Sequence, residues 1–139
     1  MPPPFFPNSS AIAQADALQT LLALSVVKLF KSGFTPTVDT VVAELDAEEA
    51  DYTTYAPETI TAWLDPQLSP LGGAQITAPT VQFVLGATPA VPNTIGGYWI
   101  ETAAGAVMLI RQFDEPVPMV LASQGITITP TIVVPNGTS

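Results

Sequence analysis

The sequence predicts an all-β fold: an antiparallel β-sandwich or jelly-roll-like domain with short helical segments and an extended N-terminal arm. Short stretches rich in Thr, Val and Ile alternate in polarity and are separated by Pro and Gly. The chain holds 15 Pro and 9 Gly in 139 residues, which interrupts long helices. Residues 95–102 and 107–113 flank the turn Ala-Ala-Gly-Ala and predict a β-hairpin. Several short strands with turns between them are typical of a sandwich.

Residues 1–16 are predicted to form the extended arm, and residues 17–139 a single β-sandwich domain. The first seven residues, MPPPFFP, contain four prolines, which exclude helix and favour the polyproline conformation. Phe5 and Phe6 lie in this segment and are predicted to bind a partner surface. The next segment, residues 17–24, is either a short helix capped by Asp16 or already a strand.

The central elements follow from local patterns. Residues 25–31 (SVVKLFK) and 58–64 (ETITAWL) alternate as strands do. Residues 38–45 predict a short helix. Residues 75–85 predict an edge strand or one bulged around Pro79, and residues 126–134 (ITITPTIVV) a last strand bent or placed at an edge by its proline.

The shortage of charge predicts a protein that contacts other protein. Charged residues make up 11% of the chain, against about 25% in ordinary domains. Residues 66–100 and 116–139 contain none. Prolines within the first of these stretches exclude a membrane-spanning helix there. We therefore expect exposed apolar and hydroxyl-rich surfaces that assembly covers.

The net charge of −9 argues against nucleic acid as a partner, because phosphate binding requires clustered Lys and Arg. Five acids lie within residues 44–51. This run is either a solvated turn or helix face, or a docking patch for a basic partner or a loose cation site. It lacks the glycine of a typical calcium loop.

Enzymatic chemistry is not predicted. The chain has no His and no Cys, so the common general base, thiol nucleophile and zinc ligands are missing, and we expect no cofactor and no metal. A carboxylate pair is the remaining option, with Asp114 and Glu115 near Glu101 across the hairpin, as glycoside hydrolysis uses. Adjacent residues at a strand end point apart, so a solvated loop end or an ion pair with Arg111 is the favoured interpretation.

The aromatic residues have two interpretations. Exposed Trp and Tyr side chains on a sandwich stack on sugars or on a partner, whereas buried ones fill a core or an interface. Trp63 and Trp99 join Phe5 and Phe6 as the predicted partner-binding residues. The tyrosines considered with them are Tyr52, Tyr55 and Tyr98.

An ordered set of motifs resembles a known group of proteins. KLFKSGFTPT (residues 28–37), an acidic stretch running into a Tyr, IGGYWIETAAGAVMLIRQFDEPVPM (residues 95–119) and ITITPTIVV (residues 126–134) occur in this order. The set resembles small virion-associated structural proteins of tailed bacteriophages, of the head-decoration or head-fibre type.

The resemblance implies a virion protein without enzymatic activity, assembled in the host cytoplasm. It implies a capsid decoration or cement protein, or the base of a head fibre. Its expected partners are itself, as a homo-oligomer such as a trimer, and other virion proteins such as the major capsid protein. The alternative is a receptor- or carbohydrate-binding module of a phage tail or fibre.

Deletion of residues 1–10 is expected to leave the β domain folded and to weaken attachment or oligomerisation. The prolines reduce the entropy lost when the arm docks. Size-exclusion chromatography with light scattering checks this expectation, and unchanged assembly after the deletion would contradict a docking role for the arm.

Overall fold

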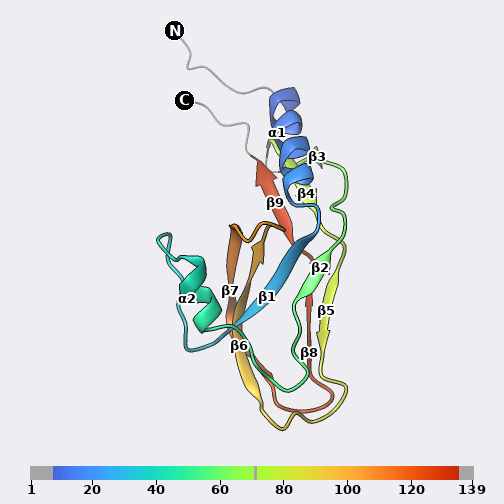
Figure 1. The fold of residues 1–139 in the computed structure, drawn as a ribbon. Helices are drawn as coiled ribbons and strands as arrows, with labels where there is room; N and C mark the ends of the chain where they lie inside the picture. The colour runs from blue at the N-terminus through green and yellow to red at the C-terminus, as the bar shows by residue number, and fades with distance from the viewer. Residues whose placement is uncertain (1–7, 71, 135–139) are drawn as a thin grey trace. The chain divides into compact units, whose positions relative to one another are not determined.

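The structure is a computed structural model that describes residues 8–70 and 72–134 (Figure 1). It is mostly β, with antiparallel sheets and two short helices, and the described residues form no closed barrel. The described chain groups into two compact units, where the sequence predicted one domain over residues 17–139. One unit holds the first helix with Ile60–Thr80 and residues 129–134, and the other holds Leu24–Thr59 and Val81–Ile128.

The first unit packs a helix on a small sheet. Helix α1 (Asn8–Leu21) contacts strands β3 (Gln67–Leu68), β4 (Ala74–Thr77) and β9 (Thr131–Val134), which form an antiparallel sheet in the order β3-β4-β9. Small buried side chains on the helix let it approach the sheet closely. The buried residues of this unit include Ala11, Ala15, Leu22, Ala74 and Ile76.

Helix α1 corrects the predicted arm, because residues 8–16 are helical rather than extended. The prolines that favour extension end at Pro7, and the segment from Asn8 onward is rich in Ala, the strongest helix former. Asp16 lies inside the helix instead of capping it. Residues 1–7, including Phe5 and Phe6, lie outside the described part of the chain.

The second unit contains two sheets and a short helix. One antiparallel sheet has the order β2-β1-β6-β7 and the other pairs β5 with β8. The helix, α2 (Val42–Ala47), lies between β1 and β2 in the chain. The strands are β1 (Ser25–Lys31), β2 (Glu58–Ile60), β5 (Val81–Val84), β6 (Asn93–Glu101), β7 (Val107–Met119) and β8 (Gly125–Ile128).

The predicted hairpin is confirmed as β6 and β7. The Thr102 N–H donates to the Ala106 carbonyl at 2.8 Å, and the Gly105 N–H donates to the Thr102 carbonyl at 2.9 Å. Gly105 has a φ of 92°, a left-handed conformation that glycine adopts without strain. The predicted strand over residues 25–31 is confirmed as β1. Strand β1 pairs with β6 along the edge of β6 that β7 does not occupy.

Prolines set the ends of other strands. The predicted strand over residues 75–85 is divided by Pro79 into β4 and β5, and the strand over residues 126–134 is divided at Pro130 into β8 and β9. The predicted strand over residues 58–64 ends early, at Ile60.

The predicted helix over residues 38–45 begins four residues later, at Val42. Before it, the hydroxyl groups of a turn take backbone donors that a helix would otherwise use. The Thr37 N–H donates to Thr40 Oγ1 at 2.7 Å, and the Asp39 N–H donates to Thr37 Oγ1 at 3.2 Å. Residues 36–40 are therefore a hydrogen-bonded loop.

Strand β6 is the most deeply buried strand of the second unit. Every residue from Ile95 to Glu101 is buried, as in strands covered on both faces. On one face, Phe30, Leu45 and Trp99 form a fully buried cluster. Partly buried side chains pack against it, and these are Phe34, Val107 and Ile110.

Gly97 allows β6 to fit between its neighbours. A Cβ atom at this position would overlap the Arg111 carbonyl oxygen and the ring of Phe30. Gly97→Ala is therefore expected to destabilise the protein by about 3 kcal/mol, since backbone and a buried ring must move. Chemical denaturation measures the change.

Gly33→Ala is the matched control. A Cβ atom at Gly33 meets nothing within 4 Å. This variant is expected to be neutral or more stable by up to about 1 kcal/mol. Equal effects at the two glycines would contradict the close packing of Gly97 on Phe30.

Candidate functional site

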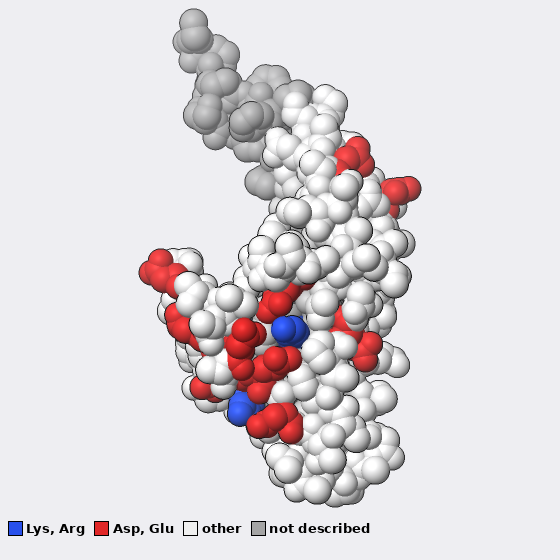
Figure 2. Space-filling view, in the orientation of Figure 1, with Lys and Arg blue, Asp and Glu red and all other residues white. Residues whose placement is uncertain are grey.

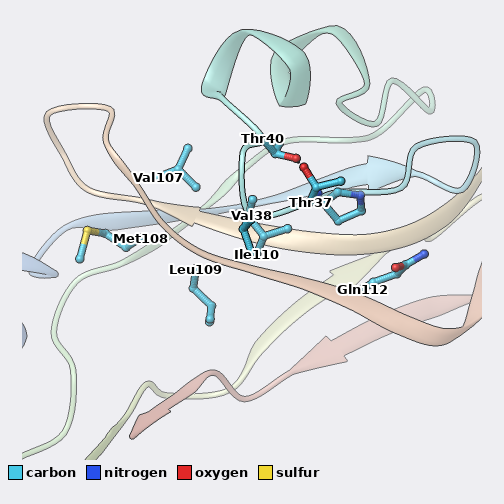
Figure 3. A pocket seen from close by; sticks show the side chains of 9 residues that line it. Thr37, Val38, Thr40, Val107, Met108, Leu109, Ile110 and Gln112 are labelled. Atoms are coloured by element: carbon cyan, nitrogen blue, oxygen red, sulfur yellow. The ribbon is translucent and has the colours of Figure 1, made fainter. Parts of the chain in front are cut away.

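A groove of about 580 Å³ lies between the 36–40 loop and strand β7 (Figure 3). Successive residues of a strand point to opposite faces, yet four successive residues, Val107 to Ile110, all line this groove. The groove therefore reaches the backbone edge of the strand. The remaining lining residues are Pro36, Thr37, Val38, Thr40 and Gln112.

Strand β7 ends its sheet, and among the described residues no strand pairs with its outer side. An open edge carries unpaired N–H and C=O groups, which proteins usually shield with charge, proline or a bulge. The part of β7 beyond Gln112 has such shielding, with Asp114, Glu115, two prolines and an irregular register. Residues 107–112 carry a single charge, on Arg111, and so form an open apolar edge.

The loop side of the groove carries an exposed apolar residue between threonines. The Val38 side chain is fully exposed, at 101%. The Thr37 and Thr40 hydroxyl groups accept hydrogen bonds from the loop's own backbone, and these bonds hold the loop in shape with the Val38 side chain in solvent. A fully exposed Val lies beside half-buried Val107 and Ile110. Exposure of this apolar surface to water is unfavourable, and covering it lowers the free energy.

A buried polar group supports the sheet beneath this groove. Lys28 Nζ lies 3.4 Å from Glu101 Oε2, and Trp99 Nε1 donates to Glu101 Oε1 at 2.8 Å. Lys28 Nζ also lies 5.9 Å from the centre of the Trp99 ring, within reach of a cation–π interaction. Glu101 is 8% exposed, so this carboxylate serves structure.

The acidic run is partly built into the fold. Tyr55 donates its hydroxyl proton to Glu49 Oε2 at 2.6 Å and accepts from the Leu29 N–H at 3.2 Å. Asn93 Nδ2 donates to Asp51 Oδ1 at 2.9 Å, and this bond, aided by Lys31, lowers the pKa of the Asp51 carboxyl.

The other acids of the run remain in solvent. Glu44 and Asp46 are exposed on α2. Figure 2 shows acidic side chains gathered over this region around the few basic ones, while most of the visible surface is uncharged. The solvated-face interpretation fits α2, and structural contacts account for Glu49 and Asp51. Within the described ranges, no three His, Cys, Asp or Glu side chains are grouped to hold a metal ion.

The carboxylate pair that the sequence left as the remaining enzymatic option does not form a cluster. Glu101 pairs with Val107 beside the turn, whereas Asp114 and Glu115 follow Gln112, which pairs with Gly97 toward the open end of the hairpin. Glu101 and the two acids therefore lie several residues apart along the paired strands. Asp114 and Glu115 are exposed, as the solvated alternative expected.

The two predicted partner-binding tryptophans are buried. Trp99 is 0% exposed and Trp63 is 4% exposed, so neither presents its ring to a sugar or a partner in this structure. The sequence reasoning did not identify the residues that do line a surface groove. The available signal was the run Val-Met-Leu-Ile at residues 107–110, four successive apolar residues on the second strand of a hairpin.

Comparisons with known proteins add no identification. A scan against protein-family models, a search of curated proteins and a search of solved structures each found no match to this chain. The resemblance to phage virion proteins therefore rests on the sequence motifs alone. Among the described residues, no helix has the length and apolar character needed to cross a membrane.

All three tyrosines of the chain are held in the neutral form. Burial raises the pKa of Tyr98, raises that of Tyr52 to about 12 and raises that of Tyr55 further, with the Glu49 hydrogen bond adding to the last. Unfolded tyrosine ionises near pH 10, with a pKa of about 10. The folded protein therefore loses stability as the pH rises from about 10 toward 12.

Tyrosinate absorbance followed against pH is expected to stay low in the folded protein until unfolding releases the rings together. The same titration in denaturant should show ionisation with a pKa of about 10. A folded protein in which one tyrosine titrates freely near that pH would contradict the burial of the rings.

Proposed function

We propose that this chain is a non-enzymatic structural protein that assembles through the uncharged groove and the open edge of β7. The observation that carries the proposal is an edge strand with four successive apolar residues beside a fully exposed Val38. The motif resemblance adds the setting, a tailed-phage virion, in which the chain acts as a capsid decoration or cement protein or as a head-fibre base.

Assembly accounts for the low charge of the chain. Stable interfaces bury roughly 800 Å² per partner and are depleted of charge at their centres. The groove lining contains no charged residue, and Val41 and Val42, which follow the loop in the chain, are also exposed. A cement protein requires lasting contact with itself and with a capsid protein, and it requires no catalytic group.

We also propose that the two sheets of the second unit are the layers of a small sandwich. Residues on β5 and β8 alternate between buried and exposed, so each strand turns one face inward. Phe83 on the buried side of β5 stacks with Tyr55, at 6.3 Å between ring centres and 15° between planes. Tyr55 in turn accepts from the Leu29 N–H of β1, which links the two layers.

A receptor- or carbohydrate-binding role has less support. It requires an exposed Trp or Tyr ring beside polar groups. Burial of both tryptophans removes its main candidates.

Val38→Lys tests the assembly surface. Val38 is fully exposed, so the change removes no core contact, and a charged side chain at the groove should weaken self-association or capsid binding by about tenfold or more. Light scattering at micromolar concentration measures self-association, and co-sedimentation with capsids measures binding to the particle.

Val84→Lys is the matched control, because Val84 is 64% exposed on β5 and lies outside the groove. It should assemble like the wild-type chain. A wild-type monomer that also fails to bind capsids would contradict the proposal, as would equal effects of the two lysine variants. A particle image that places the chain on neither head nor tail would overturn the virion setting.

A further inference from the structure

We propose that the open edge of β7 pairs antiparallel with β7 of a second copy, about a two-fold axis at Ile110, so that two four-stranded sheets join into one. This inference deepens the proposed function by naming the partner of the groove, and it rests on the proposal that the chain assembles there. The structural elements are residues 107–112, the 36–40 loop and the empty side of the strand between them.

The shape of the site selects an extended strand as its occupant. The groove follows consecutive residues of β7, and the backbone groups on that side have no strand partner among the described residues. A strand added at this edge satisfies the backbone donors and acceptors, while its side chains meet the apolar lining. The occupant must itself be extended, must have a free edge and must present uncharged side chains.

The distribution of charge selects a second copy. Two chains of net charge −9 repel one another, so they meet most readily where acids are few. The segment 107–112 contains no acid and carries Arg111, which forms no ion pair within the described chain. The same segment is extended and has a free edge, and apart from Arg111 its side chains are uncharged. Self-pairing through a two-fold axis is the commonest arrangement of homo-oligomers.

The faces of the strand set the register. Val107 and Ile110 pack against the Phe30, Leu45 and Trp99 cluster on one face of the sheet. Leu109 and Arg111 pair with Ile100 and Tyr98 and lie on the other face. Residues opposite each other in neighbouring strands share a face, so Ile110 opposite the partner's Ile110, with Leu109 opposite the partner's Arg111, matches the faces of these three residues.

Neighbouring registers fail for physical reasons. A shift of the pairing by one residue sets Leu109 against the partner's Ile110, on opposite faces. A shift of two residues from the proposed register, toward the C-terminal side, places Arg111 directly opposite the partner's Arg111. Like charges directly opposite each other are destabilising. A shift of two residues toward the N-terminal side sets Arg111 against the partner's Val107. The irregularity near the turn places Val107 on the other face of the sheet from Arg111.

The absence of Cys from the sequence allows a direct test by single-cysteine cross-linking of the full chain. In the proposed register Ile110→Cys faces itself, with Cα atoms about 4.5 to 5.5 Å apart, which suits a disulfide. Gln112→Cys is the control in the same groove. Its two copies lie about 13 Å apart along the paired strands, too far to bridge.

Under mild oxidation, Ile110→Cys should form disulfide dimers faster than Gln112→Cys by about tenfold or more, because pairing raises the effective thiol concentration. If Ile110→Cys fails to fold, Leu109→Cys mixed with Arg111→Cys provides the second test, since these positions face each other only between copies. The mixture should give heterodimers in preference to either homodimer. Equal cross-linking of all variants, or none, would overturn the proposed pairing.

Light scattering of the cysteine-free chain separates this inference from the proposed function. Gln112→Lys should weaken a dimer by about tenfold or more, and Gln82→Lys, at an exposed strand position outside the groove, should not. A trimer or ring unaffected by Gln112→Lys would overturn the β7 pairing and leave assembly standing. A wild-type monomer that binds capsids would overturn the self-pairing alone. A wild-type monomer that does not bind capsids would overturn both the self-pairing and the proposed function.

Discussion

The close approach of strand β6 to its neighbours is the constraint on which the second unit depends. Gly97 has no side chain where the Phe30 ring and the Arg111 carbonyl lie, so β1 and β7 can both pack against a fully buried strand. Phe30 lies in one buried cluster with Leu45 of α2, and its ring meets Phe34 edge-on, at 5.7 Å between ring centres. Phe34 precedes the 36–40 loop, so the same packing positions the rim of the groove.

Charged groups inside the sheet are satisfied by one another, whereas the outer edge of β7 is not covered by any described strand. Lys28, Trp99 and Glu101 satisfy one another on a buried face, and breaking such a group leaves an uncompensated charge. The edge of β7 keeps both unpaired backbone and apolar side chains, and pairing with another strand satisfies both at once.

Local sequence patterns predicted the positions of strands and turns better than they predicted the burial of side chains or the order of strands in a sheet. Strand β1 and the β6–β7 hairpin followed from alternation and a glycine turn, and Pro79 and Pro130 marked real breaks. The start of helix α1 was not predicted, because the prolines before Asn8 favour an extended backbone, whereas the alanines after it favour helix. The burial of Trp99 and the open side of β7 depend on sheet order, which brings together residues far apart in sequence and has no local pattern.

Hydrogen exchange of β7 at different protein concentrations tests the central claim most directly. Peptides covering residues 107–112 should exchange rapidly at low concentration, where the outer amides meet water, and become protected as copies pair. Peptides from β6 should stay protected throughout, since that strand lies between β1 and β7. Exchange in residues 107–112 that is independent of concentration, both for the chain alone and with capsids added, would contradict the account.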